Sequence, residues 1–235
     1  MDIAQQLDRL DWPSLEASLW ERGYASLPPL LTAADCAALI ALYSRADLFR
    51  ARIEMARHRF GVGDYQYFAH PLPAVVAELR GSAYSHLAPI ANRFAAALGE
   101  DGRYPAELAA MLELCHRHGQ TRPTPLLLHY EAGGYNCLHQ DLYGDVAFPF
   151  QLVCFLNRPG RDYQGGELLL VEQRPRAQSV GEAVQGEQGA AVIFTTRDRP
   201  VRGARGYYRA RMRHGVSRIR SGTRYTLGVI FHDAR

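Results

Sequence analysis

A histidine and an aspartate stand two residues apart in the middle of the chain. The stretch LHYEAGGYNCLHQD, residues 128–141, is largely apolar and aromatic, and it ends on His139, Gln140 and Asp141. On a β-strand, residues i and i+2 point to the same face, so this imidazole and carboxylate can bind one metal ion while Gln140 points away. The alternative is two polar residues on the solvent face of a strand.

The best candidate for a third ligand lies far downstream. His214 stands in RMRHGVSR, near the end of a later β-run. Two histidines and one carboxylate on one face of a metal leave three positions open, the arrangement of non-haem Fe(II) oxygenases. His116 and His118 fall on a predicted helix, where i and i+2 do not share a face. The other histidines lack a partner pattern and are interpreted as surface or satisfied core residues: His58, His70, His86, His129 and His232.

A possible anion receptor follows ten residues after His214. In SGTRYTLGVIFHD, Arg224 and Thr226 share one strand face. A guanidinium group can hold a carboxylate through two parallel hydrogen bonds, and the threonine hydroxyl adds a third. A buried arginine without an anion would be costly, although the mirrored alternation would point Arg224 outward. The opposite strand face should pack on helices: Tyr225, Leu227, Val229 and Phe231.

The elements that must position these residues change character near residue 121. Residues 1–121 are predicted to be mainly helical, whereas residues 122–235 are short apolar runs separated by Gly, Pro, Asn and Asp. The second pattern is typical of an antiparallel sandwich or jelly roll. We therefore expect an α+β fold in one integrated domain, with a double-stranded β-helix (jelly roll, cupin-like) core and an N-terminal helical layer packed on one sheet. Helices are predicted at 12–22, 33–46, 72–99 and 105–118, and extended strand at 49–68.

Composition limits the classes of protein. A hydrophobic fraction of 47% and a charged fraction of 22% are those of a soluble globular protein. No apolar run approaches the roughly 18–20 residues of a membrane span, so no membrane partner is expected. The polar N-terminus lacks the pattern of a secretion signal, and the four cysteines are too scattered for a disulfide framework or a zinc site. A cytoplasmic location is expected.

The basic residues are unevenly placed. All 27 are arginine, and between Arg197 and Arg224 ten arginines face a single acid, Asp198. This segment predicts a basic surface, although a codon bias toward arginine is the favoured explanation of the all-arginine composition.

Several separated motifs together resemble the Fe(II)- and 2-oxoglutarate-dependent dioxygenases. They are HYEAGGY…HQD, YQGGELLL and RHGVSRIRSGTRYTLG, and the resemblance covers roughly residues 124–233. It implies His139, Asp141 and His214 as iron ligands. It also implies Arg224 as the partner of the distal carboxylate of 2-oxoglutarate, assisted by Thr226, with Tyr130 reaching the cosubstrate from the first core strand.

The resemblance implies an oxidoreductase that uses Fe(II), 2-oxoglutarate and O2, with ascorbate as a possible reductant. It would hydroxylate a substrate C–H bond and release succinate and CO2. The ten-residue spacing from His214 to Arg224 is similar to that of prolyl hydroxylases, which favours a protein residue such as proline, or a small molecule, as substrate.

The alternative substrate is alkylated nucleic acid. The whole chain looks like a bacterial family of predicted oxygenases labelled as acting on damaged nucleic acid by oxidative demethylation. The basic, tyrosine-bearing segment Arg197–Arg213 supports this alternative, whereas the residues after Arg224 depart from the AlkB-type repair pattern R-x-N-x-T-x-R. Two further alternatives are a non-oxygenase metal-binding protein of cupin type and a catalytically silent binding protein.

Overall fold

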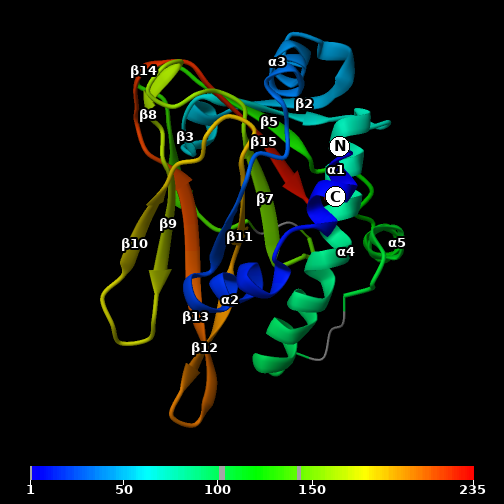
Figure 1. Ribbon diagram of the computed structural model, residues 1–235, viewed down its shortest axis with the longest axis vertical. Helices are drawn as coiled ribbons and strands as arrows, with labels where there is room; N and C mark the ends of the chain where they lie inside the picture. Colours follow the sequence, from blue (N-terminus) through cyan, green and yellow to red (C-terminus); the bar gives the residue numbers. More distant parts are fainter. Residues whose placement is uncertain (1, 101–103, 142–143) are drawn as a thin grey trace.

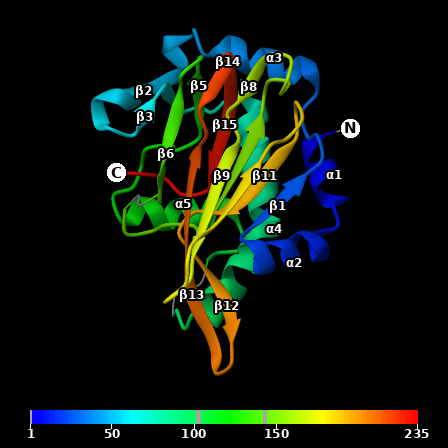
Figure 2. The same cartoon turned by 90° about the vertical axis from the view of Figure 1, so that its left-hand side faces the viewer.

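The computed structural model describes residues 2–100, 104–141 and 144–235. Two antiparallel β-sheets face each other, and helices cover the outer face of the larger sheet (Figure 1). The view turned by 90° shows the strands of the two sheets lying over one another (Figure 2). The architecture is the predicted α+β jelly roll with a helical layer on one sheet.

The helices begin and end at the signals that their sequences carry. The helix at 12–22 begins after Asp11, whose side chain accepts a hydrogen bond from the Ser14 N–H, and ends at left-handed Gly23. Thr32 and Asp35 form a reciprocal capping box at the next helix. The helices are α1 (Ile3–Asp8), α2 (Trp12–Arg22), α3 (Ala33–Leu42), η1 (Ala46–Leu48), η2 (Met55–His58), α4 (Ala74–Ala97) and α5 (Leu108–Arg117).

The strands form two principal sheets. The larger has seven strands in the order β1-β11-β7-β15-β5-β4-β2, and the smaller has the order β10-β9-β13-β6-β3, with β12 paired to β13 and a separate β14-β8 pair. The strands are β1 (Tyr24–Leu27), β2 (Phe49–Glu54), β3 (Gly61–Val62), β4 (Asp64–Phe68), β5 (Leu126–Tyr130), β6 (Tyr135–His139), β7 (Phe150–Phe155), β8 (Tyr163–Gly165), β9 (Leu168–Gln173), β10 (Val180–Val184), β11 (Ala191–Thr195), β12 (Asp198–Gly203), β13 (Gly206–Val216), β14 (Ile219–Gly222) and β15 (Arg224–Ile230).

The single extended strand predicted over 49–68 is wrong. The segment folds as β2, the short helix η2, β3 and β4, because Arg59 adopts a left-handed conformation and Gly61 and Gly63 have φ values of 139° and 143°. These φ values favour glycine. A Cβ atom on Gly61 would lie 2.2 Å from the carbonyl oxygen of Tyr135, so this turn needs glycine to lie against β6.

The first 121 residues contribute more than helices. β1, β2 and β4 join the larger sheet, and β3 joins the smaller one. The predicted division near residue 121 stays a prediction, but strands from both sides of it share each sheet. α1 lies outside the predicted helices.

The main core lies between α4 and the outer face of the larger sheet. Leu227, Val229 and Phe231 of the last strand region are buried there, as their alternation predicts. On α4, Arg80 donates to the carbonyl of Ile230 at 2.8 Å and forms an ion pair with Asp233 at 2.8 Å. These contacts fix β15, and with it the inner face that carries Arg224. No helix within the described ranges is long and apolar enough to cross a membrane.

Candidate metal and cosubstrate site

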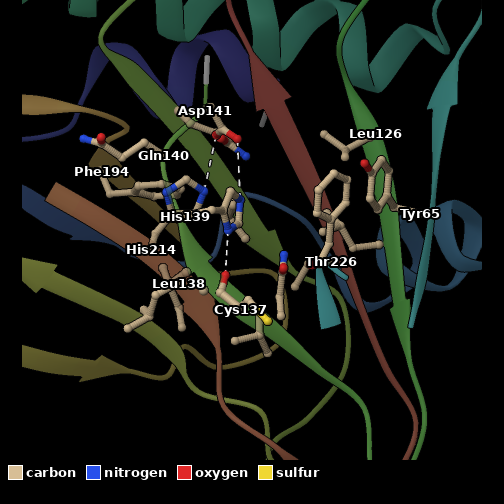
Figure 3. Close-up of a pocket in the computed structure, with 18 of the residues that line it drawn as sticks. Tyr65, Leu126, Cys137, Leu138, His139, Gln140, Asp141, Phe194, His214 and Thr226 are labelled. Carbon is tan, nitrogen blue, oxygen red and sulfur yellow. Dashed lines mark hydrogen bonds and ion pairs between the residues drawn. The ribbon is translucent and has the colours of Figure 1, made fainter. Parts of the chain in front are cut away.

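Three side chains with metal-binding atoms converge at the ends of β6 and β13. The ligand atoms of His139, Asp141 and His214 all lie within 4.8 Å of one another (Figure 3). The Asp141 carboxylate oxygens lie 3.5 Å from Nε2 of His139 and 3.3 Å from Nε2 of His214. Ligand atoms at right angles around one metal ion, with bonds of about 2.1 Å, lie about 3 Å apart. The spacing therefore fits a metal ion held on one face.

A β-bulge in β6 places His139. His214 pairs with His139, but Val216 pairs with Asn136, so three steps along β6 match two steps along β13. Bulges re-aim side chains and are frequent beside active sites. Here both Asn136 and His139 line the same cavity. The H-x-D spacing indicated the shared face, but it carried no signal for this bulge.

Hydrogen bonds orient the first imidazole. Nδ1 of His139 lies 2.7 Å from the carbonyl oxygen of Cys137. Because a carbonyl only accepts, Nδ1 carries the proton, and the lone pair is left on Nε2, which faces Asp141. This is the tautomer that a metal ligand needs.

The charges in the triad are mutually dependent. Burial alone would raise the pKa of the Asp141 carboxyl, but when the imidazoles are protonated the charge of His214 and the N–H donors of both rings hold that pKa well below its ordinary value. Burial acts to lower the pKa of His139, and its hydrogen bond and attraction to Asp141 outweigh this and raise it. A carboxylate that stays ionised beside two imidazoles suits a divalent cation.

The side chain of Gln140 binds backbone carbonyl groups and not the triad, as its position in H-x-D implies. Its amide nitrogen donates to the carbonyl of Arg197 at 2.8 Å and to that of Met212 at 2.9 Å. These bonds tie the end of β6 to β13 and to the segment before β12.

Arg224 lies in the wall of the same cavity, which has a volume of about 460 Å³. Its side chain is buried, and its Nε and Nη1 atoms have no hydrogen-bond partner among the described residues. Its guanidinium carbon is 5.7 Å, 5.8 Å and 6.0 Å from the ring centres of Tyr130, Phe155 and Tyr163. Ring faces stabilise a cation but do not replace hydrogen-bond acceptors. A bound anion would supply the hydrogen-bond acceptors that the guanidinium of Arg224 lacks.

The two other predicted cosubstrate residues differ in position. Thr226 is buried and lines the cavity. Tyr130 is fully buried and is absent from the cavity lining in the part of the chain that the structure describes, and its hydroxyl lacks a partner there. Burial raises the pKa of Tyr130 to about 12, and the nearby charge of Arg224 acts in the opposite direction.

Sequence reasoning missed several residues of the cavity wall, among them Tyr65, Tyr67 and Gln151. The two tyrosines are two apart on β4, which was the available signal, because i and i+2 share a face. Gln151 is buried, and its side-chain oxygen has no hydrogen-bond partner within the described ranges. It offers a polar contact to a ligand in a wall that also contains the apolar residues Leu126, Leu128 and Val153.

The arginine-rich segment forms the projecting β12–β13 hairpin (Figure 1). Arg199 is buried and paired with Glu172, and Arg209 is paired with Glu100 at 2.6 Å. Along β13, residues 209, 211 and 213 are exposed whereas 210, 212 and 214 are buried, so these arginines lie on the face opposite to His214. The hairpin tip at Gly206 is eight residues, or roughly 26 Å, from the triad.

Fold and site define a class of protein. The chain shares its fold with a prolyl-4-hydroxylase of Pseudomonas putida, at a TM-score of 0.57 and 18% identity, covering 95% of this chain and 99% of the other. An oxidoreductase of the 2-oxoglutarate–Fe(II) oxygenase family from Burkholderia pseudomallei gives 0.56 and 15%, covering 96% and 93%. The fold is thus that of the 2-oxoglutarate- and Fe(II)-dependent oxygenases.

The sequence comparison names the family within this class. Residues 63–234 match the family described as an oxygenase catalysing oxidative methylation of damaged DNA, and the chain belongs to it. Uncharacterized proteins from two strains of Mycobacterium tuberculosis are each 53% identical over 167 residues, covering 71% of this chain and 72% of theirs. The protein is an oxygenase and therefore an oxidoreductase.

Proposed function

We propose that the protein is an Fe(II)- and 2-oxoglutarate-dependent dioxygenase that hydroxylates a substrate C–H bond. His139, Asp141 and His214 would hold the iron, and Arg224 would hold the distal carboxylate of 2-oxoglutarate. One observation carries the proposal: a buried arginine with unsatisfied N–H groups lies in the wall of the same cavity as the convergent triad. A cupin-type metal protein that is not an oxygenase has no use for that arginine.

The surroundings of Arg224 support a carboxylate as its ligand. An uncompensated buried charge is strongly unfavourable, and a carboxylate satisfies two guanidinium donors at once. The nearby carboxylate of Glu167 already accepts a hydrogen bond from Ser217. A Cβ atom on Gly166 would lie 2.8 Å from Cδ of Arg224, so only glycine leaves the arginine room to lie against this strand end. Thr226 would add a hydroxyl donor, and Tyr130 would back the guanidinium.

Bound Fe(II) and 2-oxoglutarate would supply the oxidising chemistry, converting 2-oxoglutarate, O2 and R–H into succinate, CO2 and R–OH. The chain holds and shields the reactants. Leu126, Leu128 and Val153 make the wall apolar, which limits water near the reaction. Ascorbate as a reductant and a cytoplasmic location stay predictions.

The substrate proposal favours a methyl group on nucleic acid. The family's description supports it, and hydroxylation of an N-methyl group leads to loss of formaldehyde and hence to demethylation. A protein residue such as proline, or a small molecule, is the other candidate. The likeness to a prolyl hydroxylase is one of fold, so it adds no weight to that candidate.

The test is succinate release by the wild-type protein with Fe(II), 2-oxoglutarate and O2, across alkylated oligonucleotides, peptides and free amino acids. We expect succinate without substrate at a low rate, and faster release with an N-methylated oligonucleotide together with formaldehyde. No succinate under any condition, and no 2-oxoglutarate-dependent visible absorption band with Fe(II) under anaerobic conditions, would refute the oxygenase proposal. Stimulation by a peptide or an amino acid alone would show that the substrate is a protein residue or a small molecule and not nucleic acid.

A further inference from the structure

The mouth of the cavity carries an exposed aromatic side chain beside an exposed arginine. Phe60 is 47% exposed, and both Arg59 and Phe60 line the cavity. Of the five exposed large hydrophobic residues among those described, Phe60 and Leu138 line the cavity, and Leu138 directly precedes His139 (Figure 3 labels Leu138 and His139). Single exposed apolar residues are ordinary, but a group at the mouth of a reactive cavity indicates a contact surface.

The backbone holds Phe60 in place. Its N–H donates to the carbonyl of Met55 at 3.1 Å, and its carbonyl accepts from the N–H of Cys137 at 2.7 Å. Met55 is fully buried, and Cys137 lies two residues before His139 in the bulge of β6. Both backbone groups are thus satisfied, and the ring projects outward from a fixed point. Such an anchored ring gives contact area without a large loss of conformational freedom on binding.

Phe60 is surrounded by an imidazole ring and by two arginine side chains. The ring of His58 stacks on Phe60 at 5.4 Å between ring centres and an interplanar angle of 23°. Arg57 pairs with Glu54 at 2.5 Å, whereas the guanidinium of Arg59 has no ion pair or hydrogen bond within the described ranges. A flat ring next to an exposed guanidinium suits a ligand that combines a planar base with a phosphate.

We infer that the segment Met55–Val62, here called the mouth segment, is the nucleic-acid contact of this oxygenase, with an unpaired base stacked on Phe60 and a neighbouring phosphate held by Arg59. The inference rests on the proposed function, because that function is what gives this surface a role in binding substrate. It moves the nucleic-acid contact from the arginine-rich hairpin, whose β13 arginines face away from His214, to the rim of the cavity itself.

Charge and position favour this ligand over a peptide. The polyanion complements Arg59, and a stacked base places the next nucleotide at the cavity that holds the triad. The hairpin offers a matched comparison, because Tyr207 is also 47% exposed and lies near Arg205, but at the far end of β13. The two surfaces thus present similar chemistry at different distances from the site.

The experiment measures binding of a fluorescein-labelled single-stranded oligonucleotide by fluorescence anisotropy, without iron or 2-oxoglutarate, so that it does not depend on turnover. Phe60→Ala should weaken binding about 5- to 150-fold, the range for loss of one stacked base, and Phe60→Trp should restore it. A plot of log K against log salt has a negative slope, and Arg59→Ala should make that slope less steep by about 0.7, the value for one phosphate contact on a single strand. Tyr207→Ala and Arg205→Ala should leave both quantities unchanged.

Each other outcome has a definite meaning. If the hairpin variants weaken binding and the mouth variants do not, the inference is wrong. It is equally wrong if the wild-type protein fails to bind at low salt, or if a peptide binds in a Phe60-dependent manner where the oligonucleotide does not. Thermal unfolding of every variant checks that the fold is intact. Because succinate release by the wild-type protein is measured separately, the failure of this inference and that of the proposed function are distinguishable.

Discussion

Arg224 and Tyr130 lie directly opposite each other on the antiparallel strands β15 and β5, with the guanidinium carbon 5.7 Å from the centre of the tyrosine ring. The cation has an aromatic neighbour, but two of its nitrogens and the tyrosine hydroxyl have no hydrogen-bond partner within the described ranges. Arg224, which lines the cavity, therefore has N–H donors available for an anion bound there.

Removing that cation should weaken binding of the cosubstrate. Arg224→Ala is expected to raise the KM for 2-oxoglutarate at least tenfold, because charge-assisted hydrogen bonds contribute about 1.5–3 kcal/mol. kcat should change less, because the arginine holds the end of 2-oxoglutarate that does not react. Steady-state succinate assays measure both. Arg220→Ala, an exposed arginine on β14, is the control. An unchanged KM in Arg224→Ala means that another residue holds the carboxylate.

Removing a triad residue should abolish metal binding. In His139→Ala and Asp141→Ala we expect loss of bound Fe(II), measured as metal content after anaerobic loading and gel filtration, and succinate formation at background. The exposed His118 at the end of α5 gives the control variant His118→Ala, which should keep both. Retention of iron and turnover in either triad variant contradicts the ligand assignment.

The buried ion pair between Arg80 and Asp233 should be important for stability. Their side chains are 2% and 0% exposed. Arg80→Ala leaves the buried carboxylate of Asp233 with only the exposed His116 beside it, at 3.2 Å, and should lower the free energy of unfolding by about 3–5 kcal/mol. In contrast, Arg45 and Asp47 are 60% and 62% exposed, so Arg45→Ala should cost about 0–1 kcal/mol. Urea denaturation measures both, and equal losses would show that burial of the pair is not what matters.

His232 should make stability depend on pH. Burial, followed by the charge of Arg80, lowers the pKa of His232 from 6.5 to about 4. Below pH 6.5 the unfolded chain therefore takes up a proton that the folded chain does not, so stability falls as the pH drops toward 4. At pH 4.5 the loss from this group should be about 2–3 kcal/mol. Nδ1 of His232 accepts from the N–H of Phe148, which an asparagine oxygen can also do.

The variant His232→Asn tests this linkage. Its free energy of unfolding should change less than that of the wild-type protein between pH 7.5 and pH 4.5, and urea denaturation at each pH gives the difference. Parallel curves for the two proteins would show that His232 does not carry the pH dependence.

The sequence was most informative where chemistry depends on spacing within a strand. The i, i+2 rule placed His139 with Asp141, and it separated Arg224 and Thr226 from the apolar face of β15. Spacing along one strand says nothing of which strands become neighbours, so the proximity of His214 depended on the resemblance and on the choice of residue type.

Other features had weak local signals. β12, DRPVRG, contains a proline and three charged residues, and the exposed edge strand β10, VGEAV, lacks a clear alternation. The mouth segment was read as extended strand because its residues alternate in part, although RHRFGVG places two glycines beside an isolated phenylalanine. Its turn depends on close contact with Tyr135 of β6, which is distant in the sequence.

The seven-stranded sheet has β1 at one edge and β2 at the other, and both come from the first 54 residues. The strands from the second half of the chain thus occupy the interior, and residues 122–235 alone would leave the β11 and β5 edges open to pairing with other chains. Pairing of β1 with β11 joins Tyr24 to Phe194, a long loop closure that slows folding. The N-terminal strands act as edge protection, so an expressed C-terminal half should aggregate where the full chain does not.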